Sequence, residues 1–349
     1  MADNGFRCGE YFAALEQFVS ADDFLCLRKA LGPAGGDGPF PGELERVRIF
    51  MEKHGPFYHP ARLEVQARGR TDCFVVNVAL SKAGRRVIQG EYRCLKQLRE
   101  SFGEPYVPRA YDYGEVAIGK GRTASMFVGE WLAGYHEFHV TATPDGGQAV
   151  AVWDTENGRR CLSNDQARDV YRLASRILTY YYELATGRQI FPWHHAAGDF
   201  VLRITGGDVH VRLVTVRQYA SMLESAGTDS VMMLNGLLLF FLNLSIRMRL
   251  DRLDGIGDSV WIGEYILPGI VNGFLEGLDT KPAPMGGIST SIHQSWTGYF
   301  HSFSSGELLE LFHFILDTYP AESPELPIIR QNLKQHAEGL RAAMSHWRS

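Results

Sequence analysis

Two histidines and an aspartate stand close together in "FPWHHAAGDF", residues 191–200, and their side chains could do chemistry. A neutral histidine is a good general base near pH 7, and an aspartate could orient it. Two histidines and a carboxylate could also bind a transition metal. Adjacent histidines, however, do not easily both face one ion from a strand. The segment therefore offers His194, His195 and Asp199 as candidate catalytic residues, with Asp199 also a candidate metal ligand.

A structural role for the same segment remains open. Trp193 and His194 would then pack in the interior, and Asp199 would cap a turn or bind the amides of its own loop. The choice depends on the elements that hold the loop in place.

The loop is flanked by a long helix and a hairpin. Residues 164–187 predict the helix, from a capping Asn164 to a terminal glycine. Residues 199–219 predict two strands around a Gly-Gly-Asp turn. From residue 229 onward the pattern is helical, apart from a Gly/Ser-rich stretch near 280–304.

The first part of the chain predicts a small antiparallel sheet into which one helix is inserted. A helix over 9–30 and a short helix over 43–55 precede this sheet, and a hairpin over 137–162 follows it. Strands are expected at 61–67, 72–80, 109–118 and 123–132, and the inserted helix is expected at 85–103.

This order of elements resembles the protein-kinase-like fold, in particular its aminoglycoside- and choline-phosphotransferase branch, over roughly residues 60–275. The resemblance implies an α+β, two-lobed fold. A small antiparallel-sheet N-lobe with one inserted helix would precede a mainly helical C-lobe. The expected divisions are a helical extension at 1–55, a β-rich N-lobe at 56–134 and a C-lobe at 135–349.

The resemblance also implies roles for residues of the N-lobe. In such enzymes a lysine on the strand before the inserted helix neutralises nucleotide phosphates, and a glutamate on that helix holds the lysine. Glu91 matches the glutamate, whereas Asn77 stands where the lysine is expected and Lys82 is the nearest lysine. These residues, with Thr215, are the candidate cofactor-binding positions. Glu91 could instead pair with a basic neighbour on a solvated helix face.

His194 and Asp199 resemble two positions of the kinase catalytic loop. In His-x-Asp-x-x-x-x-Asn the aspartate is the base and the asparagine binds magnesium, five residues later. His194 and Asp199 have the same spacing, so His194 occupies the base position and Asp199 the metal position. A second metal-binding aspartate is missing, because Arg212 or Thr215 occupies its place.

Three functions follow from these positions. A site with Asp199 alone, which Arg212 or Arg217 could face, would hold Mg²⁺-ATP weakly. The sequence therefore favours a non-catalytic, pseudokinase-type protein that binds a small molecule or protein partner in the inter-lobe cleft. The alternatives are a divergent ATP- and Mg-dependent small-molecule phosphotransferase, with His194 as base, and a metal-dependent enzyme that uses the His-His-Asp loop.

Composition narrows the remaining classes of function. A net charge of -5 and a pI near 6.2 argue against a nucleic-acid-binding surface. The five cysteines are scattered without a CxxC pair, and no secretory signal is visible, so a cytoplasmic protein with reduced thiols is expected. The apolar stretch Val231–Met248 is long enough to span a bilayer, but polar residues interrupt it and a buried helix is expected.

Overall fold

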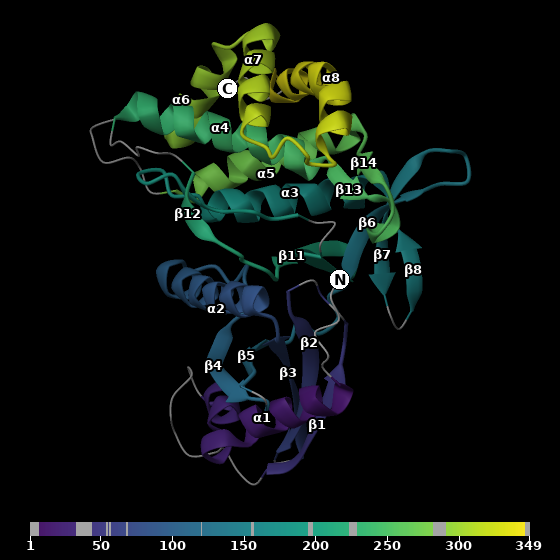
Figure 1. Cartoon of the computed structure of the whole chain (residues 1–349). Helices are drawn as coiled ribbons and strands as arrows, with labels where there is room; N and C mark the ends of the chain where they lie inside the picture. Colours follow the sequence, from purple (N-terminus) through teal and green to yellow (C-terminus); the bar gives the residue numbers. More distant parts are fainter. Residues whose placement is uncertain are drawn as a thin grey trace. The chain divides into compact units, whose positions relative to one another are not determined.

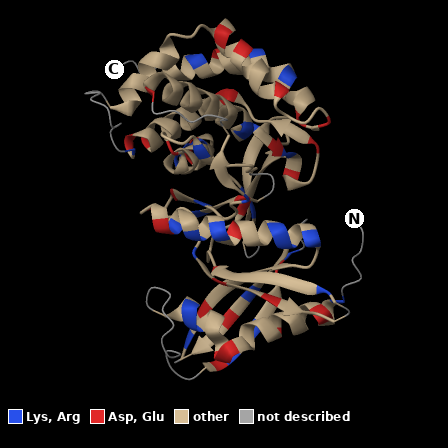
Figure 2. Ribbon diagram, turned by 60° about the vertical axis from the view of Figure 1, so that its left-hand side comes forward, with Lys and Arg blue, Asp and Glu red and all other residues tan. Residues whose placement is uncertain are grey.

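A computed structural model describes residues 7–32, 44–53, 55, 57–67, 69–119, 121–154, 157–194, 198–222, 229–281 and 291–345 (Figure 1). The chain divides into two compact units, Met1–Ala133 and Gly134–Ser349. Acidic and basic residues are interspersed along the elements of both units (Figure 2).

The first unit is built on a five-stranded antiparallel sheet with the strand order β1-β2-β3-β5-β4. Side chains alternate across β3, so Phe74, Val76 and Val78 face one side of the sheet and are buried there. Helix α1, Cys8–Leu31, packs into the same hydrophobic core. The strands are β1 Leu44–Met51, β2 His59–Ala67, β3 Arg70–Ala79, β4 Ala110–Ala117 and β5 Thr123–Glu130.

One helix is inserted between β3 and β4. This helix, α2, runs Lys82–Ser101 and begins after Ser81, whose hydroxyl accepts a hydrogen bond from the Gly84 amide at 3.0 Å. Its buried stripe includes Ile88, Leu95 and Leu98, spaced as one face of an amphipathic helix. The predicted sheet with one inserted helix is therefore confirmed.

The helix predicted over residues 43–55 is wrong, because residues 44–51 form strand β1. Val47 and Ile49 pair with Val65 and Leu63 of β2. The β-branched side chains of Val47 and Ile49 suit a half-buried strand. The apolar positions also match a helical period over this short stretch, so pairing with β2 decides the conformation. The expected helical extension at 1–55 thus holds one helix and the first strand of the sheet.

The second unit begins with β structure. Strands β6 and β7 form the hairpin predicted within 137–162, and β8 adds a third strand that was not predicted. Strands β10 and β11 form the hairpin predicted within 199–219. Two short strand pairs, β9 with β12 and β13 with β14, complete this part. The bounds are β6 Glu137–Ala142, β7 Gln148–Asp154, β8 Gly158–Cys161, β9 Arg188–Ile190, β10 Phe200–Thr205, β11 Asp208–Leu213, β12 Tyr219–Ser221, β13 Leu250–Arg252 and β14 Ser259–Trp261.

The rest of the second unit is helical. Helix α3 begins after a Ser163 cap and ends at Tyr181, six residues before the predicted end, because Glu183–Gly187 forms a turn. The helices are α3 Asn164–Tyr181, α4 Ser230–Met248, α5 Leu267–Asp279, α6 Ile292–His301, α7 Ser305–Asp317 and α8 Leu326–Ser345, with short 3₁₀ turns at Leu253–Gly255 and Glu264–Ile266.

Helices α3 and α5 approach closely because α5 presents glycines at every fourth position. A Cβ atom at Gly269 or Gly273 would collide with a carbonyl oxygen of α3, and one at Gly277 would collide with the side chain of Thr179. Glycines at this spacing line one face of a helix, where they allow two backbones to meet.

Helix α4 is the one described helix that is long and apolar enough to cross a membrane, and 56% of its most apolar window is buried within the protein. Taken together, the elements make an α+β fold of two lobes. An antiparallel sheet with an inserted helix comes first and a mainly helical lobe second, in the order of the predicted kinase-like fold.

Candidate functional site

The loop at 191–199 is anchored to helix α4. Trp193 is buried, and its ring meets Phe200 edge to face, with centroids 5.9 Å apart. The carbonyl oxygen of Trp193 accepts hydrogen bonds from Nη2 and Nε of Arg247, at 2.6 and 3.2 Å. The same guanidinium lies over the rings of Phe191 and Trp193. Arg247 therefore fixes the backbone immediately before His194.

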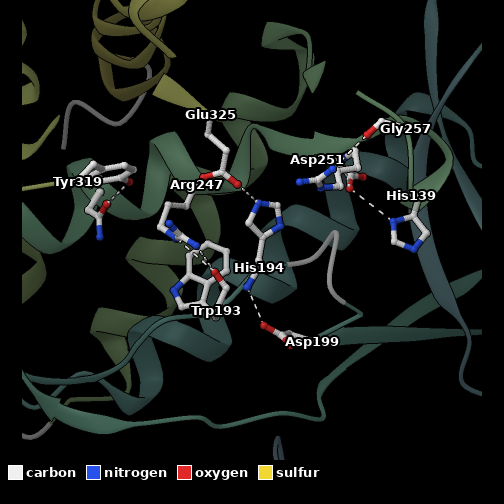
Figure 3. Close-up of polar contacts among 11 residues, drawn as sticks. His139, Trp193, His194, Asp199, Arg247, Asp251, Gly257, Tyr319 and Glu325 are labelled. Atoms are coloured by element: carbon white, nitrogen blue, oxygen red, sulfur yellow. Dashed lines mark hydrogen bonds and ion pairs between the residues drawn. The ribbon is translucent and has the colours of Figure 1, made fainter. Parts of the chain in front are cut away.

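His194 is held from two directions. Its backbone N–H donates to Oδ2 of Asp199 at 2.7 Å, and its ring Nε2 lies 2.7 Å from Oε1 of Glu325. Figure 3 shows the ring directed toward Glu325, on the other side of the His194 backbone from Asp199. Burial raises the pKa of Glu325, but the hydrogen bond and charge of His194, with Arg247, lower it overall. An ionised Glu325 accepts a hydrogen bond from Nε2–H.

Asp199 is completely buried, and Arg217 neutralises it. The two guanidinium nitrogens of Arg217 donate to the two carboxylate oxygens, Nη2 to Oδ1 at 2.7 Å and Nη1 to Oδ2. Such a bidentate pair is the strongest arrangement open to these groups. The carbonyl oxygen of Asp199 also accepts from the Val214 amide at 2.7 Å. The expectation that Arg212 or Arg217 faces Asp199 is confirmed for Arg217, and Asp199 does bind an amide of its own loop.

The second unit also contains the candidate residues Thr215 and His195. Thr215 lies half-buried in the segment between β11 and Arg217. His195 lies outside the described residues.

The structure does not bring the candidate residues of the first unit together as a lysine–glutamate pair. Lys82 is exposed at the start of α2 and Glu91 is buried on the same helix. Nine residues correspond to about two and a half turns, so the two side chains leave opposite faces of α2. Asn77 is half-buried in β3, between Pro60 of β2 and Phe127 of β5.

The alternative that placed Glu91 on a solvated helix face is wrong. Glu91 is fully buried because it falls in the stripe of Ile88, Leu95 and Leu98 that faces the first unit's interior. Its position three residues after Ile88 and four before Leu95 is a signal that sequence inspection could have used.

Sequence inspection did not find Arg247 and Glu325, which hold the loop. Glu325 is 131 residues from His194, and Arg247 is 54 residues from Trp193, so local spacing gives no information about either contact. Arg247 does carry a weak signal, because it is a charged residue within an apolar helix.

A second polar cluster lies at the start of β6. The buried Asp251 accepts hydrogen bonds from the amides of Val140 and Arg252, both at 2.7 Å, and lies 3.5 Å from Nδ1 of His139 (Figure 3). Burial lowers the pKa of His139, but Asp251 and Glu137 outweigh it and raise this pKa to about 9. His139 is therefore cationic at neutral pH.

The arrangement at Asp199 does not fit a magnesium ion. Magnesium needs carboxylate oxygens that are free to coordinate it, and the guanidinium of Arg217 engages both oxygens of Asp199. Among the described residues, no group of three or more His, Cys, Asp and Glu side chains could hold a metal ion.

This chain is similar to solved structures, one of which is described below. No family model matches the chain, and no curated protein sequence matches it. A structure of WaaP in complex with acyl carrier protein aligns with 86% of this chain and 90% of its own, at 12% identity and a TM-score of 0.29. The fold class of this chain therefore rests on its own order of elements.

Proposed function

We propose that this kinase-like chain is a non-catalytic, pseudokinase-type protein that binds a ligand or a protein partner. The observation that carries the proposal is the pairing of Asp199 with Arg217. Asp199 occupies the position expected to bind magnesium, and Arg217 neutralises it inside the protein. A magnesium ion would have to displace the guanidinium and leave it beside a second cation, at a large electrostatic cost.

The position of His194 supports the same function. A general base and a metal ligand that act on one substrate must face the same point. The Nε2 atom of His194 faces Glu325 at 2.7 Å, and its ring points away from Asp199. His194 and Asp199 therefore attach the loop to Glu325 and Arg217, and they do not present a base and a metal ligand to one substrate.

The first unit adds a third argument. Strand β3, Arg70–Ala79, contains no lysine, and Lys82 and Glu91 leave opposite faces of α2. A nucleotide that relied on the usual lysine–glutamate pair would find no lysine on β3, and Lys82 does not replace it as a partner of Glu91.

The alternatives require rearrangements of this loop. A phosphotransferase that uses His194 and Asp199 would need Glu325 and Arg217 to release them. A metal enzyme built on His194 and Asp199 would need the His194 ring to turn to the opposite side of its backbone. The proposed binding role needs neither change.

The test is a nucleotide assay on the full chain. Thermal shift and phosphate release are measured with Mg²⁺-ATP on the wild type, on Asp199→Asn and on Asp208→Asn, an exposed control at the start of β11. We expect Asp199→Asn to remove no magnesium-dependent stabilisation, because magnesium does not bind at Asp199. We expect no phosphate transfer by any of the three proteins. Magnesium-dependent turnover that Asp199→Asn abolishes and Asp208→Asn retains would overturn the proposal.

A further inference from the structure

Strand β1 forms one edge of the five-stranded sheet in the first unit. Among the strands that the structure describes, it pairs only with β2, on one of its two sides. An edge strand presents unpaired N–H and C=O groups on its open side, and a further strand can add to the sheet there. The backbone pattern and the side chains of β1 identify a strand that fits this edge.

Every second residue of β1 directs its backbone N–H and C=O groups to the open side. The amide of Glu52, just after the end of β1, donates to the carbonyl oxygen of Pro60 in β2 at 3.1 Å. Residues of an antiparallel ladder point these groups alternately toward the partner strand and away from it. The register with β2 is regular from Arg46 onward, so the even-numbered residues bind β2. The residues left at the open edge are Val47, Ile49 and Met51.

The side chains of this segment divide between the two faces of the sheet. Those of the three edge residues are half-buried and pack against the core of the first unit. Those of Arg46, Arg48, Phe50 and Glu52 alternate with them on the other face and are exposed. The exposed face therefore carries two arginines in the first half of the segment, and a phenylalanine and a glutamate in the second half.

We propose that this edge binds β1 of a second copy of this chain, antiparallel, in a two-fold dimer centred on Ile49. Odd-numbered residues of one copy then lie opposite odd-numbered residues of the other, so the open backbone groups of both edges pair with each other. A two-fold interface is self-complementary, and each contact forms twice. The sheets of the two copies become one continuous sheet.

The charges on the exposed face favour this register. It places the partner's Glu52 opposite Arg46 and the partner's Phe50 opposite Arg48. Opposite charges on facing strands attract, and a guanidinium can stack on an aromatic ring. Arg46 forms no side-chain hydrogen bond or ion pair with any residue that the structure describes. Glu52 pairs with Arg62 of its own chain at 2.8 Å, and a carboxylate can accept further hydrogen bonds.

The neighbouring registers match less well. An axis at Arg48 places this residue opposite its own copy, and an axis at Val47 places Arg46 opposite the partner's Arg48 twice. Like charges directly opposite each other destabilise a strand pair. An axis at Phe50 shortens the ladder, because Arg46 and Val47 then lie beyond the end of the partner's strand. The register centred on Ile49 is therefore the longest one without facing arginines.

A groove of about 420 Å³ between β1 and α1 leaves room on the core face of this edge. Phe12 and Phe24 of α1 are part of its apolar lining, with Val47 and Ile49 of β1, and none of the four is fully buried. The partner's Met51, which the register places opposite Val47, would enter this groove. The dimer would thus remove from water apolar surface that the single chain exposes.

Sedimentation equilibrium on the full chain tests the dimer through its charges. The proteins are the wild type, Arg46→Glu, Glu52→Arg, the double variant Arg46→Glu/Glu52→Arg, and Arg86→Glu. Arg86 is exposed on α2, so Arg86→Glu makes the same change of charge away from β1.

We expect the wild type and Arg86→Glu to dimerise alike as the protein concentration rises. Each single variant at Arg46 or Glu52 should dimerise about tenfold more weakly or worse, because two attractive pairs become repulsive. The double variant should recover dimerisation, since it restores both pairs with their charges exchanged. All these side chains are exposed, and equal thermal unfolding of the five proteins at low concentration checks that each one folds.

Hydrogen exchange tests the backbone pairing without any substitution. The edge amides of Val47, Ile49 and Met51 should exchange more slowly at high protein concentration than at low concentration. The amides of Arg48 and Phe50, which face β2, should change little. A wild type that stays monomeric at every concentration, edge amides that gain no protection, or equal dimerisation by Arg46→Glu and Arg86→Glu would each disprove this interface. The outcome is independent of the proposed function, because β1 lies in the first unit and the Asp199–Arg217 pair in the second.

Discussion

At the scale of single residues, the loop at 191–199 is defined by partners that come from distant parts of the second unit. Arg217 binds the side chain of Asp199, Glu325 binds that of His194, and Arg247 binds the carbonyl oxygen of Trp193. The sequence identified the loop, its five-residue spacing and Arg217 as a candidate neighbour of Asp199. It could not identify Glu325 or Arg247, because only the packing of the helices brings them to the loop.

The Asp199–Arg217 pair leads to an asymmetric prediction for stability. Arg217→Met would leave a fully buried carboxylate without its cation, whereas Asp199→Asn would leave a guanidinium that is one-quarter exposed and can reach water. Loss of one partner of a buried pair typically costs about 3–5 kcal/mol. We expect Arg217→Met to lower the free energy of unfolding by about 3 kcal/mol, and Asp199→Asn by about half as much.

Urea unfolding followed by tryptophan fluorescence measures both changes, since five of the six tryptophans lie in the second unit. The double variant Asp199→Asn/Arg217→Met should lose less than the sum of the single variants, because it leaves no unpaired charge. If the free energy of unfolding of Arg217→Met lies within about 0.5 kcal/mol of the wild-type value, Arg217 does not stabilise the fold by neutralising Asp199.

At the scale of elements, the spacing of apolar residues and the residue types at turns predicted most of the helices and strands. Helix α2 and strands β2 and β3 follow from clear apolar patterns and adjacent turn residues. Strand β1 was missed because an eight-residue stretch with mixed periodicity does not reveal a pairing partner in β2. The early end of α3 was missed because Gly187 marks the end of the turn that follows the helix, not the end of the helix itself.

The contact between α3 and α5 gives a prediction about glycine. A Cβ at Gly273 would meet the Arg172 carbonyl in the backbone of α3, which cannot move aside as a flexible side chain can. We expect Gly273→Ala to destabilise the protein by about 2 kcal/mol or more, as overpacking does. Gly298→Ala, in the middle of α6, has open space around its Cβ and should be neutral or stabilising by up to about 1 kcal/mol.

Thermal unfolding of the two glycine variants provides the comparison, because both make the same chemical change inside a helix. If Gly273→Ala and Gly298→Ala unfold at the same temperature, close backbone contact does not determine how α3 packs on α5.

At the scale of the whole molecule, two titratable groups of the second unit give stability opposite dependences on pH. Asp251 and Glu137 raise the pKa of His139 from its ordinary 6.5 to about 9. Burial lowers the pKa of Lys281 from 10.5 to about 7, although its ammonium group donates to the carbonyl oxygens of Tyr180 and Tyr182 at the end of α3. Neither shift follows from composition, because each depends on which groups the fold buries together.

The two contributions oppose each other between pH 7 and pH 9. Stabilisation from His139 is complete below its unfolded pKa and is lost as the pH rises through about 9. Lys281 has the opposite effect, since the unfolded chain keeps its proton up to a higher pH than the folded one, so folding becomes more favourable as the pH rises above 7. Each contribution amounts to a few kcal/mol at most, at about 1.4 kcal/mol per pH unit.

We therefore expect the unfolding free energy of the wild type to change little between pH 7 and pH 9. His139→Gln should become more stable as the pH rises over this interval, and Lys281→Met should become less stable, because each variant retains only the other group. Urea titrations at several pH values measure these slopes, and comparison with the wild type cancels the other titrating groups. Parallel slopes for all three proteins would mean that neither pKa differs between the folded and unfolded chain.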